Sequence, residues 1–371
     1  MSDSDKQIFD SIGNVLAALL NVMRMLEHGS SFKKLMNIAH HKKDFESSKL
    51  ALEDSSKNLI EISVPKELDI LKTQLLGISE LCSRVIRNFQ GKHFQDLQEG
   101  LSSYCRAQEK LYPLSKIFQP VSQFFLEKKR QNDSELIREL AAGTRGEERG
   151  IRHHNNQPGE RGGFSFYIPE NKSQKASLPL IVALHGSSGH GADFLWNWLK
   201  EARSRGFLLL CPTSTEQTWS LENVREDLFK ILEAINKLSE ISSINSEKIL
   251  ITGMSDGATF SMLAGLRKST PFTHIAPFSG IMPASLAEMS DDTLATDRPV
   301  FLVHGTEDKM FPVETAYLTK SELETAKVEV VLKTKNSRDP KEDNPPIVFG
   351  SLQHIDWCYS KSGCDCESNK S

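Results

Sequence analysis

Ser255 stands between two glycines in the segment Gly253-Met254-Ser255-Asp256-Gly257. An apolar run, KILITG, precedes the segment, and a pattern typical of a helix, ATFSMLAGL, follows it. Glycines are needed where a strand turns sharply into a helix, because the tight turn leaves no room for side chains. A serine at such a turn is raised at the helix amino terminus, where its hydroxyl can act as a nucleophile. The spacing favours a catalytic role for Ser255 over a structural turn serine.

A second glycine-rich segment, LHGSSGHG at 184–191, follows the apolar run LPLIVA. No Gly-Lys-Ser/Thr follows it, so a phosphate-binding loop is not indicated. Its other use is to present a backbone N–H to an oxyanion, together with the N–H after the nucleophile. The candidate donors are Ser187 and Asp256. We expect His185 to orient this turn, and the alternative is that His185 is the catalytic base.

A third segment, LVHGTEDKMFPVE at 302–314, reads as a strand, a turn with acidic residues and the start of a helix. Asp308 is well placed to orient a histidine, with Glu307 as the lesser alternative. The competing interpretation is an aspartate in a buried salt bridge. The chain order serine, then aspartate, requires the histidine to follow residue 308. His354 is the only histidine that does so.

Short apolar runs alternate with helical patterns in the C-terminal part of the chain. The runs lie at 164–169, 178–185, 206–212, 248–253, 299–305 and 328–334, and helices fit between them at 192–204, 221–240, 257–268 and 313–326. From residue 179 onward the runs are nearly all apolar, as in strands buried on both faces. The pattern predicts an α/β fold with a mostly parallel sheet flanked by helices, and active sites form beyond the carboxyl ends of such strands.

The first part of the chain has a different period. In residues 1–141, apolar residues recur at spacings of three and four, which predicts an all-α bundle of four or five helices. Residues 142–162 are glycine-rich and polar, and we expect a linker or a first hairpin. The α/β domain then spans 163–357. The last segment, 358–371, is predicted to be a disordered tail.

Composition excludes several classes of function. The net charge of −4 gives no electrostatic argument for nucleic acid as a partner. The six cysteines show no paired metal-ligand spacing, so we expect free thiols and no metal site. The amino terminus is acidic, unlike a signal peptide, and IGNVLAALLNVMRML is too short to span a bilayer, so a core-facing helix is expected. These features predict a cytoplasmic protein without a membrane span.

Three segments together resemble the phospholipase/carboxylesterase family of α/β hydrolases, in particular a bacterial-type subgroup. They are LPLIVALHGSSGHGADFLWNWLKEARSRGFLLLCPTS, GMSDGATFS and LVHGTEDKMFPVETA. The resemblance extends back through GERGGFSFYIPE and to RAQEKLYPLSKIFQPVSQFFLE in the helical part. It implies hydrolysis of carboxylic esters, with short acyl chains or lysophospholipids as substrates, through an acyl-enzyme and without a cofactor. Ser255 would be the nucleophile and Asp308 the acid.

The third member of the triad departs from the family. The resemblance implies a histidine in the loop after the last core strand, just before a Pro-x-Glu/Asp-x-Asn-like stretch. This chain reads KNSRDPKEDNPP at 335–346, with Ser337 or a neighbour in that place. Either a longer loop returns His354 to Ser255, or the base is absent. A triad without its histidine loses about six orders of magnitude in turnover.

Three hypotheses of function remain open from the sequence. The first is a serine esterase with Ser255, Asp308 and His354 as its triad and a small-molecule ester as its substrate. The second is an impaired hydrolase that acts as a binding or scaffold protein, through a protein partner or self-association of residues 1–141. A weaker third hypothesis has the helical part acting at a membrane surface. Trp196 and Trp219 are either core residues or lining residues of an apolar acyl pocket.

Overall fold

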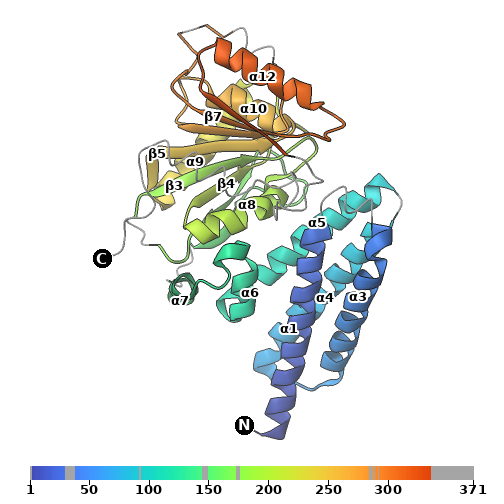
Figure 1. Cartoon of the computed structure of the whole chain (residues 1–371). Coiled ribbons are helices and arrows are strands. Elements are labelled where there is room, and N and C mark those ends of the chain that lie inside the picture. The colour runs from blue at the N-terminus through green and yellow to red at the C-terminus, as the bar shows by residue number, and fades with distance from the viewer. Residues whose placement is uncertain are drawn as a thin grey trace. The chain divides into compact units, whose positions relative to one another are not determined.

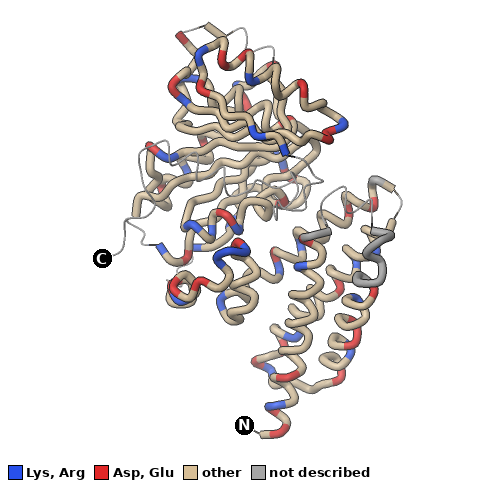
Figure 2. Tube along the Cα trace, in the orientation of Figure 1, with Lys and Arg blue, Asp and Glu red and all other residues tan. Residues whose placement is uncertain are grey.

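The computed structural model of this chain describes residues 2–29, 38–91, 93–143, 149–172, 176–283, 286, 289–290 and 292–335. The chain forms two compact units, Met1–Ala141 and Ala142–Ser371 (Figure 1). The first is helical, and the second combines a sheet with helices. His354 and the predicted tail at 358–371 lie outside the described residues. Figure 2 shows acidic and basic residues intermingled in both units, in keeping with the small net charge of −4.

The described residues of the helical unit form four long helices and several short ones. α1 packs against α3 and α4 against α5, and prolines mark two of the boundaries. Pro65 precedes α4, and Pro113 lies in the first turn of η1. Both positions suit a residue that has no backbone N–H to donate. The elements are α1 (Asp3–Gly29), α3 (Ile38–Glu61), α4 (Lys66–Phe89), α5 (Phe94–Leu111), η1 (Tyr112–Lys116), α6 (Gln119–Phe124), η2 (Lys128–Arg130) and α7 (Ser134–Ala142).

Helix α1 is longer than the apolar segment IGNVLAALLNVMRML that it contains. Over Asp3–Glu27 it is long and apolar enough to cross a membrane by length and composition alone. The sequence expectation that this segment is too short to span therefore does not hold for the whole helix. Half of its most apolar window is buried inside the unit, including Val15, Leu19 and Met23. That burial is what a core-facing helix requires, since its apolar stripe is covered by its neighbours.

The second unit is built on an eight-stranded mixed sheet in the order β1-β2-β4-β3-β5-β6-β7-β8. β1 and β2 form an antiparallel hairpin, β2 pairs antiparallel with β4, and the remaining pairs are parallel. This arrangement confirms the predicted α/β fold. The strands are β1 (Gly150–His154), β2 (Phe164–Ile168), β3 (Leu178–Leu184), β4 (Leu208–Pro212), β5 (Ile244–Met254), β6 (His274–Phe278), β7 (Val300–Gly305) and β8 (Val330–Lys335).

Helices cover both faces of this sheet (Figure 1). Leu180, Val182 and Leu184 of β3 point into the main core cluster, which also contains residues of α9, α10 and α12. The intervening Ile181 and Ala183 are buried on the opposite face, where α8 packs on β2, β3 and β4. Burial on both faces explains why these strands are nearly all apolar. The helices are α8 (Gly191–Arg205), α9 (Arg225–Ile241), α10 (Asp256–Gly265) and α12 (Val313–Thr325).

Two of the described strands, β1 and β6, are not among the predicted apolar runs, although β1 lies in the segment 142–162 for which a linker or a first hairpin is expected. β1, with the sequence GIRHH, lies at the edge of the sheet, and its residues are mostly half-buried or exposed. β6, with the sequence HIAPF, is fully buried but carries a histidine and a proline. Its neighbours β5 and β7 continue the parallel sheet through it, so β6 separates the strand before Ser255 from the strand before Asp308. The ends of β5, β6 and β7 therefore meet at one edge.

Candidate functional site

Ser255 occupies a sharp turn between β5 and α10. Its φ of 55° and ψ of −121° lie in a region that residues other than glycine rarely adopt. Its N–H donates to the carbonyl oxygen of Phe278 at 3.0 Å, and its own carbonyl oxygen accepts from the N–H of Ala258 and Thr259. Such strain costs on the order of 1–3 kcal/mol and is typical of functional turns. Within the described residues the Ser255 hydroxyl has no hydrogen-bond partner.

The glycines that flank the turn are required by close backbone contacts. A Cβ added at Gly253 would lie 2.4 Å from the carbonyl oxygen of Gly257. A Cβ added at Gly257 would lie 2.3 Å from the carbonyl oxygen of His185, at the end of β3. Backbone atoms that are held by their neighbours cannot move aside as a flexible side chain does. Glycine at these two positions thus lets α10 start directly against β3 and β5.

The loop after β3 passes beside Ser255. A Cβ added at Gly186 would lie 3.5 Å from the Cβ of Ser255. In this loop the N–H of Ser188 donates to the carbonyl oxygen of Gln217 at 2.8 Å. The N–H groups of Ser187 and Asp256, in contrast, have no acceptor among the described residues. The Asp256 N–H follows Ser255 directly and the Ser187 N–H follows Gly186, which lies beside Ser255. Backbone donors without an acceptor are what an oxyanion hole requires.

His185 is fixed in the core below this loop. Its Nε2 accepts the N–H of Ser214 at 3.1 Å, so the proton resides on Nδ1, which lies 2.7 Å from the carbonyl oxygen of Gly186. Burial lowers the pKa of His185 from 6.5 to about 3. Both ring nitrogens are occupied and the ring stays neutral, so His185 orients the loop and is not placed to take a proton from Ser255.

The two candidate pocket tryptophans are buried. The indole of Trp219 lies between the rings of His185 and Phe260, at centroid distances of 4.9 and 5.3 Å. Its N–H donates to the carbonyl oxygen of His185, and its side chain belongs to the main core cluster. Trp219 is therefore a core residue beneath the loop and does not line an open pocket. Trp196, on α8, is 6% exposed, and its role in an acyl pocket stays a prediction.

Asp308 lies in the loop after β7, at the same edge of the sheet as Ser255. Its Oδ1 accepts the N–H groups of Met310 and Phe311 at 2.9 and 3.0 Å. Its Oδ2 lies 3.8 Å from Nε2 of His304. The His304 Nε2 bonds to the carbonyl oxygen of Phe311 at 2.8 Å, and the ring is fully buried. Asp308 is thus oriented by its own loop, with Oδ2 not bound by a backbone N–H.

The six described histidines of the α/β unit each have a ring-nitrogen partner other than Ser255. The partners of His185 and His304 are given above. His153 bonds to Ser165, His154 to Lys237 and His274 to Thr273. His190 bonds to Glu160 through one ring nitrogen and to Ala192 through the other. The structure therefore brings Ser255, Ser187 and Asp256 together with Asp308 on one edge. It places no described histidine between Ser255 and Asp308.

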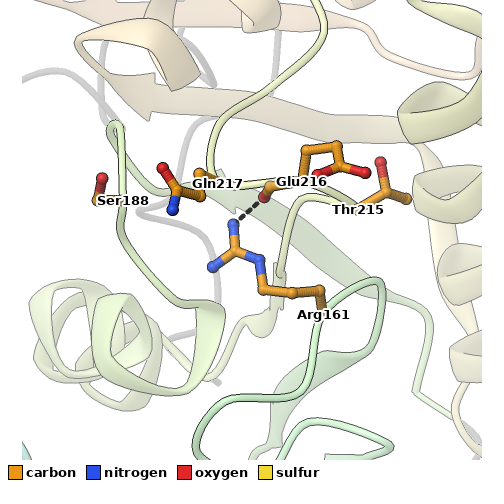
Figure 3. Close-up of a pocket in the computed structure, with 5 residues that line it drawn as sticks. All are labelled: Arg161, Ser188, Thr215, Glu216 and Gln217. Carbon is orange, nitrogen blue, oxygen red and sulfur yellow. Dashed lines mark hydrogen bonds between the residues drawn. The ribbon is translucent and has the colours of Figure 1, made fainter.

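Beside the Ser187 loop lies a pocket of about 230 Å³ (Figure 3). It is lined by Arg161, Ser188, Thr215, Glu216 and Gln217. The sequence analysis missed Arg161, which lies in the glycine-rich hairpin before β2. Its only sequence signal is a charged residue next to two glycines, a pattern that is common in loops.

The described residues contain no group of three His, Cys, Asp or Glu side chains that could hold a metal ion. The described cysteines, Cys82, Cys105 and Cys211, form no disulfide with one another. Burial raises the pKa of Cys82 to about 12, which makes this thiol unreactive.

The chain is similar to known ester-cleaving proteins. Residues 211–347 match the family described as Phospholipase/Carboxylesterase, a span that includes Ser255 and Asp308 and ends before His354. Acyl-protein thioesterase 1 of Yarrowia lipolytica is 24% identical over 177 residues, which are 40% of this chain and 77% of that protein. A bifunctional acetylxylan esterase/xylanase of Neocallimastix patriciarum is 24% identical over 164 residues, 43% of this chain and 23% of that protein.

Among solved structures, a thermostable esterase superimposes with a TM-score of 0.41 at 18% identity, covering 57% of this chain and 59% of that one. The chain thus spans about three quarters of the thioesterase, less than a quarter of the bifunctional enzyme and about three fifths of the thermostable esterase. The family match covers the strands β5 to β8 that carry Ser255 and Asp308. The part of the chain that carries Ser255 and Asp308 is therefore similar in sequence to the phospholipase/carboxylesterase family.

Proposed function

We propose that the chain hydrolyses carboxylic esters of short acyl chains or lysophospholipids, with Ser255 as nucleophile. The observation that carries the proposal is the strained turn at Ser255, with φ of 55° and two unoccupied N–H donors beside the serine. Strain of this kind persists only where the surrounding structure imposes it.

The proposed reaction proceeds in two steps. The Oγ of Ser255 attacks the ester carbon while a histidine takes its proton, and the negative oxygen of the tetrahedral intermediate accepts the N–H groups of Ser187 and Asp256. The C–O bond to the alcohol breaks, the histidine returns the proton to the leaving alcohol, and the acyl-enzyme remains. Water then repeats the attack with the same histidine as base, releasing the carboxylic acid and free Ser255.

His354 is the proposed base, and Asp308 the acid that orients it. The support comes from elimination: the described histidines of the α/β unit all have ring-nitrogen partners of their own, and His354 alone follows Asp308 in the chain. Both loop N–H bonds of Asp308 go to Oδ1, so Oδ2, which lies 3.8 Å from Nε2 of His304, accepts no backbone N–H and can accept a hydrogen bond from the base. An aspartate held in this way can fix the tautomer of a histidine.

The test is the hydrolysis of p-nitrophenyl butyrate by wild type and by Ser255→Ala, His354→Ala and Asp308→Asn. Loss of activity by several orders of magnitude in Ser255→Ala and His354→Ala is expected, since both belong to one unit. The matched controls are Gln353→Ala and Glu307→Ala, each adjacent in sequence to a proposed triad member, and both should retain activity. Wild-type turnover no faster than that of Ser255→Ala would refute the proposal.

A second candidate is a hydrolase scaffold that binds and does not turn over. The observation behind it is the segment 335–346, which lacks a histidine where the family resemblance expects one. In that case wild type and His354→Ala would both be inactive. An organophosphonate probe would also fail to label Ser255 in either protein. The helical unit would then be tested for a protein partner by affinity capture. The full chain would be compared with a chain in which residues 1–141 are replaced by an unrelated helical segment.

A further inference from the structure

Arg161 joins the two loops that flank the Ser255 edge. Its Nη1 donates to the carbonyl oxygen of Gly189 at 2.7 Å, in the loop after β3. Its Nη2 donates to the hydroxyl of Ser214 and to the carbonyl oxygen of Glu216, both in the loop after β4. Figure 3 shows the guanidinium directed at the backbone of Glu216, with Ser188 and Gln217 on the same side of the pocket. One side chain thus spans both loops.

The loop that receives Arg161 is strained. Ser188 has a φ of 57°, in the left-handed region that favours glycine. The segment is closed by a bond from the N–H of Gly189 to the carbonyl oxygen of Gly186, at 3.0 Å. A non-glycine residue keeps this conformation only where several contacts impose it. Arg161 on Gly189 and Gln217 on Ser188 are two such contacts, and they lie immediately after the proposed donor Ser187.

The guanidinium of Arg161 binds the two loops and is not available to bind a substrate. Both Nη2 hydrogens are directed at Ser214 and Glu216, and Nη1 is bound to Gly189. Nε is buried and has no partner among the described residues. A carboxylate is bound bidentately by two adjacent N–H groups, and no adjacent pair is left free here. The negative charges of Asp227 and Glu216 also face Arg161 and disfavour an anionic ligand.

We propose that Arg161 is a positioning residue that holds the Ser187–Gly189 segment, so that the Ser187 N–H meets the oxyanion. This role rests on the proposed esterase function. Arg161 acts on the transition state through the loop and not by contact with the ester, so its loss lowers kcat and leaves KM nearly unchanged. A misplaced oxyanion donor reduces kcat by about 10- to 100-fold.

The experiment compares wild type, Arg161→Lys and Arg161→Gln in the full chain. Steady-state hydrolysis of p-nitrophenyl butyrate gives kcat and KM, and hydrogen exchange of the peptide covering 185–190 reports on the loop. Lysine keeps the positive charge, but its N–H donors all lie on one nitrogen. It therefore cannot bond to both loops at once, as the planar guanidinium does. Both variants should lose about 10- to 100-fold in kcat with KM within about twofold, and both should exchange faster in this peptide.

The control is Arg298→Gln. Arg298 likewise donates to backbone carbonyl oxygens, those of Gly265, Arg267 and Thr270, but precedes β7 at the opposite edge of the sheet. It should lower thermal stability without accelerating exchange at 185–190. A raised KM with unchanged kcat in the Arg161 variants, or wild-type kcat in Arg161→Lys, would overturn the positioning role.

The exchange measurement separates this proposal from the esterase function. If wild type hydrolyses the ester no faster than Ser255→Ala, the esterase proposal fails, while the loop peptide can still be compared. Faster exchange at 185–190 in Arg161→Gln would then support the bracing of the loop by Arg161. Unchanged exchange would overturn it, whatever the activity.

Discussion

The indole N–H of Trp219 donates a hydrogen bond to the backbone carbonyl oxygen of His185 at 2.7 Å, and the two rings lie 4.9 Å apart. His185 in turn accepts the N–H of Ser214 and bonds to the carbonyl oxygen of Gly186. The loop after β3 is therefore tied to the loop after β4 through two buried aromatic side chains. This buried layer supports the loop after β3 in addition to the contacts that Arg161 and Gln217 make with Gly189 and Ser188.

Trp219→Phe should weaken this layer. The phenyl ring retains most of the packing, but the carbonyl oxygen of His185 loses its buried partner, which costs about 1–3 kcal/mol of unfolding free energy. Urea denaturation followed by circular dichroism measures the change. Trp198→Phe is the matched control, because no hydrogen bond of its indole N–H exists among the described residues and its ring packs edge-on against Phe278. Equal losses in the two variants would show that packing alone stabilises Trp219.

The stability of the α/β unit should fall as the pH drops below 6.5. Burial lowers the pKa of His185 to about 3, so between pH 6.5 and 3 the unfolded chain binds a proton that the folded chain does not. The unfolding free energy then decreases by up to about 1.4 kcal/mol per pH unit as the pH falls through this window. His274, with a pKa lowered by burial to about 4, adds to the effect with the same sign.

His185→Gln tests the assignment, since the amide oxygen can still accept the Ser214 N–H but does not titrate. Its slope of unfolding free energy between pH 5.5 and 4.5 should be shallower than that of wild type by about 1.4 kcal/mol per pH unit. Tryptophan fluorescence is suited to the measurement, because all four tryptophans belong to the unit Ala142–Ser371. Parallel slopes in the two proteins would contradict a neutral, buried His185.

Ser255→Gly should stabilise the α/β unit while it removes the proposed nucleophile. Glycine adopts the φ of 55° without strain, which releases about 1–3 kcal/mol, and its greater unfolded-state freedom offsets part of this. A net gain on the order of 1 kcal/mol is expected from urea denaturation. Ser255→Ala, which keeps the strained backbone, is the control and should match wild type within about 0.5 kcal/mol. A destabilised Ser255→Gly would mean that the turn is not strained.

Gly257→Ala should destabilise the unit severely. Its Cβ would lie 2.3 Å from the carbonyl oxygen of His185 and 2.5 Å from that of Leu184, and neither backbone atom can move without breaking the sheet. A loss of about 3 kcal/mol or more, measured by thermal unfolding, is expected. Gly13→Ala is the control, because nothing lies within 4 Å of its Cβ position on α1. That variant should gain about 0.5–1 kcal/mol in the helical unit.

Much of the fold follows from local patterns. The runs that become β3, β4, β7 and the second half of β5 are mostly apolar, and burial on both faces of a sheet demands this. The strand order could not be read in the same way, because periodicity shows which residues are buried but not which strands pair. β6 was missed for a related reason, since its histidine and proline interrupt the apolar run although tertiary contacts bury every residue.

The sequence by itself determined the positions of Ser255 and Asp308. Glycines at fixed spacing after a buried strand, and an acidic residue after another, are local consequences of backbone sterics and topology. The tertiary structure alone decided the roles of Arg161, His185 and Trp219, because each acts through partners that are more than twenty residues away in the chain. Long-range hydrogen bonds and burial leave no local pattern in the sequence. For this reason only the tertiary structure shows that Trp219 is a core residue and that Arg161 links two loops.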